Sequence, residues 1–269
     1  FRPSAITCAG ASAVLGDRFA LYSLEWPRSP TPPAGPSSAN ASGALPLRPL
    51  LLPGELPEAS DAAGAACVSG APERGCSALL LLEQGGRAVL EHRLAPGNAS
   101  GADRTRRWPL APVVQDGLVA LAAWGGHGAV QACGAQGPAA ADWALYAATA
   151  GGDVVALCPA GGLLEPVRMV LLGAGGAAEG ARPLGLHLDE AGGLWLLART
   201  TDGAVELRAW ASGGAPSTWR LPPGRRWAPG LCGLGAGRGL LAAASREGLG
   251  AAAQPELWHL WGQATSSFS

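Results

Sequence analysis

The chain has 269 residues, of which 48% are hydrophobic and 14% are charged, and its net charge is −1. This much apolar sequence can bury a core, so the composition argues against a chain that is disordered as a whole. The balanced charge argues against the basic face that nucleic-acid binding requires, and the apolar runs are too short to span a membrane.

The basic residues are of a single type, because all 19 of them are arginines. The absence of lysine excludes Schiff-base chemistry and the lysine of a phosphate-binding loop. The first residue is phenylalanine, and we expect the chain to be a processed or trimmed part of a longer polypeptide.

Short apolar runs separated by glycine-containing turns follow one another along the chain. The first unit has such runs at 4–9, 13–15, 18–26 and 45–52, with a flexible Pro/Ser-rich loop predicted at 27–44. The second unit has them at 65–69, 77–83, 87–94 and 104–110. The third has them at 118–124 or 129–133, then at 142–148, 153–158 and 166–172.

The clearest unit lies at 183–222, where four runs occupy roughly 40 residues, the period of a β-propeller blade. A last unit has runs at 230–234, 239–245 and 256–261. We therefore predict an all-β fold, a β-propeller of about five to seven four-stranded blades in a single domain over 1–269. A β-sandwich is the alternative, because it also has short strands at turn-punctuated intervals.

Three segments within residues 141–222 resemble known propeller repeats. The segment 143–157, Trp-Ala-Leu-Tyr-Ala-Ala-Thr-Ala-Gly-Gly-Asp-Val-Val-Ala-Leu, resembles the quinoprotein-type repeat, and 182–196 is similar to the blade of NHL and gluconolactonase-like propellers. The segment 202–210 resembles the end of a WD-repeat blade. The resemblance implies a propeller. Gluconolactonase-like propellers hold a divalent metal through Glu, Asn and Asp. The only asparagines here are Asn40 and Asn98, so we expect no metal and no cofactor.

An Arg-Arg-Trp run occurs twice, as Arg106-Arg107-Trp108 and as Arg225-Arg226-Trp227. The run has two interpretations. It marks a surface for an acidic protein partner, or it is a repeated strand-end pattern in which tryptophan packs between blades and arginine stays solvated. We favour the second interpretation.

Other polar residues predict structural roles. The four histidines are scattered along the chain, and we expect them to be hydrogen-bonded structural residues. Asp189 and Asp202 fall at hairpin turns, where we expect each carboxylate to accept a backbone hydrogen bond. No nucleophile motif is present, so we expect no catalytic residue and no enzyme activity.

Six cysteines and two glycosylation sequons bear on the compartment. The cysteines contain no Cys-x-x-Cys pair and most lie in apolar runs, so we expect buried free thiols. Cys67 and Cys76 flank one loop, and a disulfide between them is the alternative in an oxidising compartment. The sequons begin at Asn40 and Asn98. Free thiols favour an intracellular protein, whereas the sequons allow a lumenal or extracellular one.

These observations together predict a function of a general kind. We expect a non-catalytic platform for protein–protein interaction, with other protein subunits as partners in a larger assembly. The alternative is a secreted or lumenal propeller that binds glycans or hydrolyses a small substrate.

Overall fold

The structure of the protein is a computed structural model. It describes residues 5–9, 12–16, 21–25, 47–51, 60–68, 77–94, 105–125, 133, 143–170, 181–189, 193–210, 216–233, 239–246 and 255–260. The secondary-structure elements of these residues are twenty β-strands. Their bounds are β1 (Ala5–Ala9), β2 (Ser12–Gly16), β3 (Leu21–Glu25), β4 (Leu47–Leu51), β5 (Ser60–Val68), β6 (Ala78–Glu83), β7 (Ala88–Arg93), β8 (Thr105–Pro109), β9 (Leu118–Gly125), β10 (Trp143–Thr149), β11 (Val154–Ala160), β12 (Leu163–Val170), β13 (Arg182–Leu188), β14 (Leu194–Arg199), β15 (Val205–Trp210), β16 (Ser217–Arg220), β17 (Arg225–Trp227), β18 (Cys232–Gly233), β19 (Leu240–Arg246) and β20 (Pro255–Leu260).

The first sixteen strands form four blades, each a four-stranded antiparallel sheet whose strands pair in chain order: β1 to β4, β5 to β8, β9 to β12 and β13 to β16. Neighbouring antiparallel strands need only short connections. One of these is the predicted turn at residues 84–86, between β6 and β7. There Gly85 and Gly86 have positive φ, and the Gly86 N–H donates to the Glu83 carbonyl at 2.9 Å.

The fifth sheet has a different pattern. β20 pairs along β19 from residue 240 to residue 245, while β17 pairs with residues 244–246 of β19 and β18 with residues 240–241. Because a strand has only two hydrogen-bonding edges, β17 and β18 share the edge opposite β20, one after the other. This sheet is therefore three strands wide. The predicted count of about five to seven four-stranded blades is wrong, because the described residues form four blades that are four strands wide and a narrower sheet that completes the ring.

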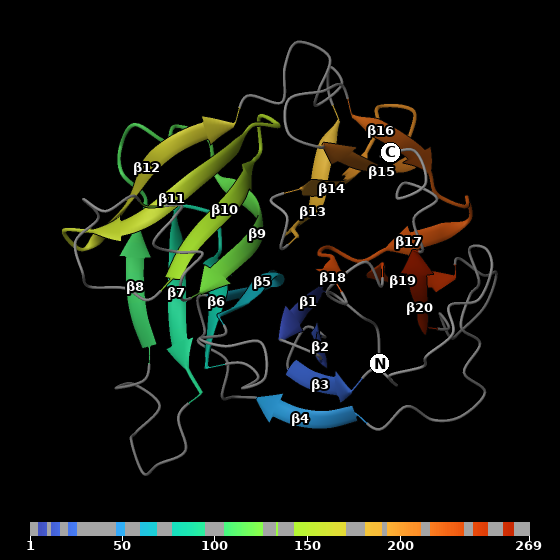
Figure 1. Ribbon diagram of the computed structural model, residues 1–269, viewed down its shortest axis with the longest axis horizontal. Helices are drawn as coiled ribbons and strands as arrows, with labels where there is room; N and C mark the ends of the chain where they lie inside the picture. The colour runs from blue at the N-terminus through green and yellow to red at the C-terminus, as the bar shows by residue number, and fades with distance from the viewer. Residues whose placement is uncertain are drawn as a thin grey trace.

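The five sheets surround a common centre, with β1, β5, β9, β13 and β18 nearest to it (Figure 1). Through these inner strands each sheet contacts the next, and the fifth contacts the first. The predicted all-β propeller is confirmed, and a sandwich of two layers is excluded. The single-domain assignment of 1–269 stays a prediction, and the loop predicted at 27–44 lies outside the described residues.

The hydrophobic core lies between sheets. One cluster of buried residues joins Leu80 of the second blade to Leu145 of the third, and another joins Leu197 of the fourth blade to Leu240 of the fifth sheet. Further clusters lie between the first and second blades and between the third and fourth blades. Every strand next to such a seam needs an apolar face toward its neighbour, which explains why apolar runs recur through the whole chain.

Backbone contacts close the ring where the fifth sheet meets its two neighbours. The Ile6 N–H donates to the Pro229 carbonyl at 3.0 Å, and the Gly230 N–H donates to the Leu184 carbonyl at 2.9 Å. Gly230 has a φ of 99°, and a Cβ at this position would overlap the carbonyl oxygen of Ile6. Only glycine therefore allows the first blade and the fifth sheet to approach this closely.

We expect Gly230→Ala to destabilise the protein far more than Gly224→Ala. Both glycines have positive φ, but a Cβ at Gly224 meets nothing within 4 Å. The free energy of unfolding of the control should therefore fall only by about 1–2 kcal/mol, the cost of a positive φ for alanine. The Gly230 variant must in addition move two backbones apart. Denaturant unfolding followed by tryptophan fluorescence measures both. Equal losses of unfolding free energy in the two variants would show that the close contact between Gly230 and Ile6 does not constrain the ring.

Candidate functional site

The first Arg-Arg-Trp run lies on β8, the outer strand of the second blade. Trp108 is 2% exposed, and its ring meets that of Trp143 of the third blade edge-on, with centroids 5.8 Å apart. The Trp108 Nε1–H donates to a carboxylate oxygen of the buried Glu91 at 2.9 Å. The indole ring is thus a packing element between blades with its polar atom satisfied, as the structural interpretation of the run predicts.

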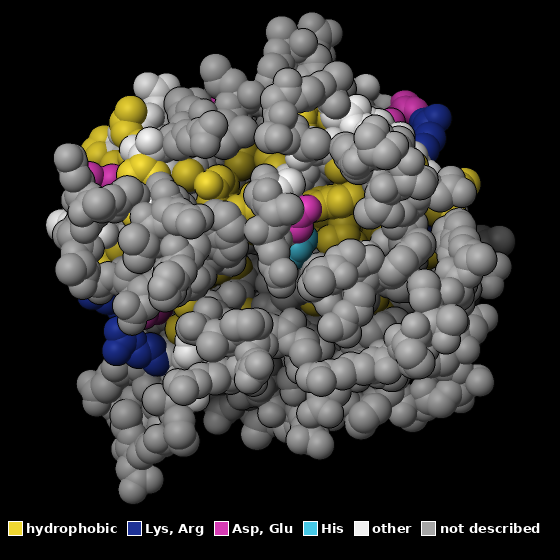
Figure 2. Space-filling model, viewed as in Figure 1, with side chains coloured by type: hydrophobic (Ala, Val, Ile, Leu, Met, Phe, Trp, Pro, Cys, Tyr) yellow, Lys and Arg dark blue, Asp and Glu magenta, His cyan; other side chains and the backbone are white. Residues whose placement is uncertain are grey.

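The two arginines before Trp108 are exposed and each is held in place. The Arg106 guanidinium lies over the Trp108 ring, 3.8 Å from its centroid, and Arg107 donates to both carboxylate oxygens of Glu83 at 2.6 and 2.7 Å. The hydrogen bond from Arg107 lowers the pKa of Glu83 below its usual value. Figure 2 shows arginine side chains gathered on the side of the molecule where Figure 1 draws β8.

The second Arg-Arg-Trp run lies on β17, in the fifth sheet. Trp227 is buried against Trp258, with ring centroids 5.6 Å apart. Arg225 donates to Glu256 at 2.8 Å and lies over the Trp258 ring at 4.5 Å. Arg226 is exposed. The two runs therefore share a local pattern, but they lie in sheets that are not neighbours in the ring, and the fold does not bring them together.

A polar cluster at the end of β13 was not predicted as a unit. His187 packs against the backbone of Gly233 on β18, where a Cβ would overlap the imidazole. Asp189 accepts hydrogen bonds from the Gly193 N–H at 2.7 Å and from the Trp195 Nε1–H at 3.1 Å. The expected turn role of Asp189 is confirmed. A histidine and an acidic side chain are visible together near the middle of the face in Figure 2.

Burial lowers the pKa of His187 from 6.5 to about 4, and the negative charge of Asp189 opposes this shift only in part. The neutral imidazole thus dominates in the folded protein at neutral pH. The sequence offered a signal for this cluster in the Asp-Glu-Ala-Gly-Gly turn at 189–193, but it gave no indication that β18 would lie against the histidine.

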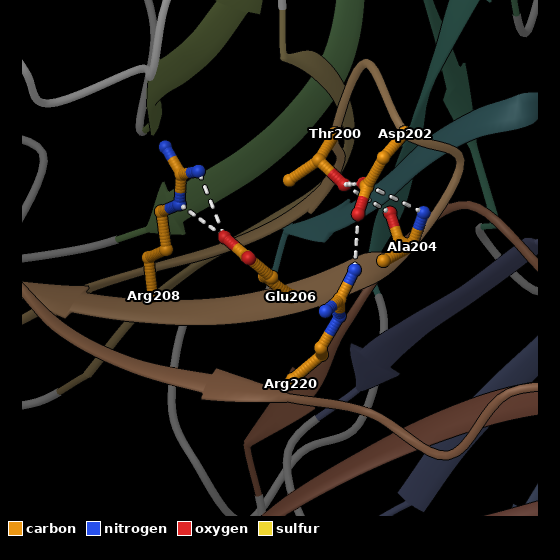
Figure 3. A network of polar contacts seen from close by, with 6 residues as sticks. All are labelled: Thr200, Asp202, Ala204, Glu206, Arg208 and Arg220. Carbon is orange, nitrogen blue, oxygen red and sulfur yellow. Dashed lines mark hydrogen bonds and ion pairs between the residues drawn. The ribbon is translucent and has the colours of Figure 1, made fainter.

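The outer half of the fourth blade carries a charge network (Figure 3). Asp202 accepts hydrogen bonds from the Thr200 hydroxyl and from the Ala204 N–H, the latter at 3.2 Å, and forms an ion pair with Arg220. The turn role predicted for Asp202 is confirmed. On the adjoining strand, the buried Arg208 pairs with Glu206 at 2.9 Å.

The cysteine expectation is wrong, because the structure contains disulfides in place of free thiols. Cys133 is bonded to Cys158, with the two Cα atoms 5.8 Å apart. Cys67 and Cys232 are also disulfide-bonded, and no cysteine of the described residues is free. The pairing of Cys67 with Cys76 stays a prediction, because Cys76 lies outside the described residues, as do Asn40 and Asn98.

Two further findings concern metals and membranes. Within the part of the chain that the structure describes, no group of three His, Cys, Asp or Glu side chains is arranged to hold a metal ion. Among those same residues, no helix has the length and apolar character that a membrane crossing requires.

Comparisons with known proteins give no family assignment. No family model matches the chain, and no curated protein matches it. Among solved structures it is similar to PorZ, a surface component of the type-IX secretion system of Porphyromonas gingivalis, with 14% identity, a TM-score of 0.45, and 94% of this chain and 26% of that chain covered. It is also similar to YCF48 from Cyanidioschyzon merolae, with 13% identity, a TM-score of 0.43, and 96% and 66% covered. A third similar structure is BBS1N, solved in complex with ARL6DN, with 13% identity and a TM-score of 0.42. The match covers 97% of this chain and 79% of that chain. The chain thus spans only part of the first two proteins, and the fold assignment here depends on strand order and register.

We expect stability to fall as the pH drops from about 6.5 to about 4 through His187. Because its pKa is lower in the folded protein, the unfolded chain binds the proton first, so this contribution is complete above the unfolded pKa and decreases toward the folded one. The maximal slope for one group is about 1.4 kcal/mol per pH unit. Denaturant unfolding at several pH values should show that the free energy of unfolding depends less steeply on pH in His187→Gln than in the wild type. An unchanged slope would contradict the assignment.

Proposed function

We propose that this propeller is a non-catalytic platform that binds an acidic protein partner as a subunit of a larger assembly, in an oxidising compartment. The observation that carries the proposal is the ordered pair of exposed arginines on β8. Arginine is enriched at the energetically dominant positions of protein interfaces, where its planar guanidinium forms paired hydrogen bonds with carboxylates.

The geometry of β8 supports a role in binding. Ordering a long side chain at an interface costs roughly 0.5–1.5 kcal/mol. Arg106 is already held over the ring of Trp108, which itself is buried between two blades. Among the described residues, no carboxylate pairs with the Arg106 guanidinium, so its hydrogen-bond donors are available to the proposed partner. Since both tryptophans of the Arg-Arg-Trp runs are buried, the arginines carry the predicted interaction and the indole rings support them.

The disulfides support the choice of compartment. Structural disulfides persist in secreted and lumenal proteins and are rare in the reducing cytosol. The described cysteines are all bonded, which reverses the preference for an intracellular protein that the sequence alone suggested. A lumenal propeller that binds glycans or hydrolyses a small substrate would need the same disulfides, so variants of the β8 arginines must separate it from the platform.

Intact mass spectrometry of the protein purified from its native source tests the compartment. Without reduction, a thiol-alkylating reagent should add no mass, and after reduction and unfolding it should label every cysteine. Glycosidase treatment should then remove mass at the sequons of Asn40 and Asn98. A protein that is fully alkylated before reduction and carries no glycan would overturn the oxidising compartment.

Substitution of the β8 arginines tests the surface. Partners cross-linked to the wild-type protein in its native secretory or extracellular fraction should be lost from an Arg106→Gln/Arg107→Gln variant, with at least about tenfold lower recovery, because charged hydrogen bonds are each worth about 1.5–3 kcal/mol. The matched control is Arg220→Gln, another exposed arginine on an outer strand, which should retain them. Equal recovery from all three proteins would refute the platform role of β8.

A further inference from the structure

Two arginines face each other on the inner half of the fourth blade. Arg182 begins β13 and Arg199 ends β14, and the two are direct partners in the antiparallel register. Cross-strand partners point to the same face of a sheet, with Cβ atoms about 4.5–5.5 Å apart. Both side chains are exposed. They lie at one end of the β13–β14 pair, opposite the end that carries His187 and Asp189.

The described carboxylates of this blade, Asp189, Asp202 and Glu206, all have other partners. Asp202 is bonded to Arg220 and Glu206 to Arg208, as Figure 3 shows. Asp189 lies at the far end of β13, bonded to Gly193 and Trp195. Within the described part of the chain, neither Arg182 nor Arg199 has an ion pair or hydrogen bond to a carboxylate. Among the described residues, this end of the blade therefore carries two positive charges with no carboxylate paired to either.

Such an arrangement has an energetic cost. Like charges directly opposite each other on neighbouring strands destabilise a sheet. An exposed single arginine needs no explanation, but two in direct register repel each other, and an anion between them relieves that repulsion. An oxyanion has the chemistry to bind such a pair, because each guanidinium presents a fork of donors that matches two oxygens.

We propose that Arg182 and Arg199 form a binding site for an oxyanion, taken either from solution as sulfate or phosphate or from the carboxylate of a partner chain. The two guanidiniums hold the anion from neighbouring strands, and its charge relieves their repulsion. The site lies in the fourth blade and is separate from the β8 arginines. It therefore goes beyond the proposed function and can be tested independently of it.

Thermal unfolding in two salts tests the site. The wild type, Arg182→Gln, Arg199→Gln and the matched control Arg220→Gln are compared in sodium chloride and in sodium sulfate at equal ionic strength. Sulfate stabilises proteins in general by exclusion from their surfaces, so the readout is the difference between variants. All three substituted positions are exposed, and circular dichroism checks that each variant is folded.

The expected result is a reversal of rank. In dilute chloride, Arg182→Gln and Arg199→Gln should melt above the wild type because repulsion is removed. In sulfate, the wild type and Arg220→Gln should show an additional rise in melting temperature that saturates with concentration, as ligand binding requires. The apparent affinity for sulfate should fall at least about tenfold in either variant of the pair. Equal sulfate responses in all four proteins would overturn the site.

A second probe separates the two sources of the anion. A short acetylated peptide of glutamates is titrated in chloride against the same four proteins. Saturable stabilisation by sulfate alone assigns the site to a free oxyanion, and saturable stabilisation by the peptide assigns it to a partner's carboxylates. Either response must disappear in both variants of the pair, and a response to neither probe rejects the proposal.

Discussion

Every sheet of this molecule depends on its neighbours to cover its two faces. Central strands such as β6 and β11 are buried along nearly their whole length, so they expose apolar surface unless sheets lie on both sides. The hydrophobic clusters between successive sheets supply that cover. The contact between the fifth sheet and the first closes the ring. The close backbone approach of Ile6, Pro229 and Gly230 is the geometric condition for closure, because no side chain fits there.

Three tryptophans that are buried or partly buried meet a second constraint, because a large ring packs well between blades when its N–H group has a partner. The structure meets this condition in the same way three times. Trp108 donates to Glu91, Trp195 to Asp189 and Trp258 to Glu256. Arginines then lie over two of these rings, Arg106 over Trp108 and Arg225 over Trp258. Packing in the core thereby fixes the orientation of charged groups near the surface, which connects the scaffold to its proposed role in binding.

Much of the fold was accessible from the sequence, because strand period and turn residues are local properties. The runs at 183–222 became β13 to β16, and the turns at Gly85-Gly86 and at Asp202 formed as predicted. The narrow fifth sheet was harder to predict, since β17 and β18 share one edge of β19 and only three-dimensional pairing reveals this. The prediction of free thiols was wrong for a similar reason. Cys133 and Cys158 are 25 residues apart, and the fold alone places them together.

For the candidate sites, too, some features follow from the sequence and others only from the tertiary structure. The sequence by itself determined that the chain is all-β, that it repeats, and that Arg-Arg-Trp recurs, because these features depend on residue type and spacing. Only the tertiary structure decided that Trp108 and Trp227 are buried while Arg106 is exposed over the Trp108 ring, and that Arg182 faces Arg199 on the neighbouring strand. Burial and register arise from contacts between segments far apart in the chain, and the pattern within one segment does not specify which segment will lie against it.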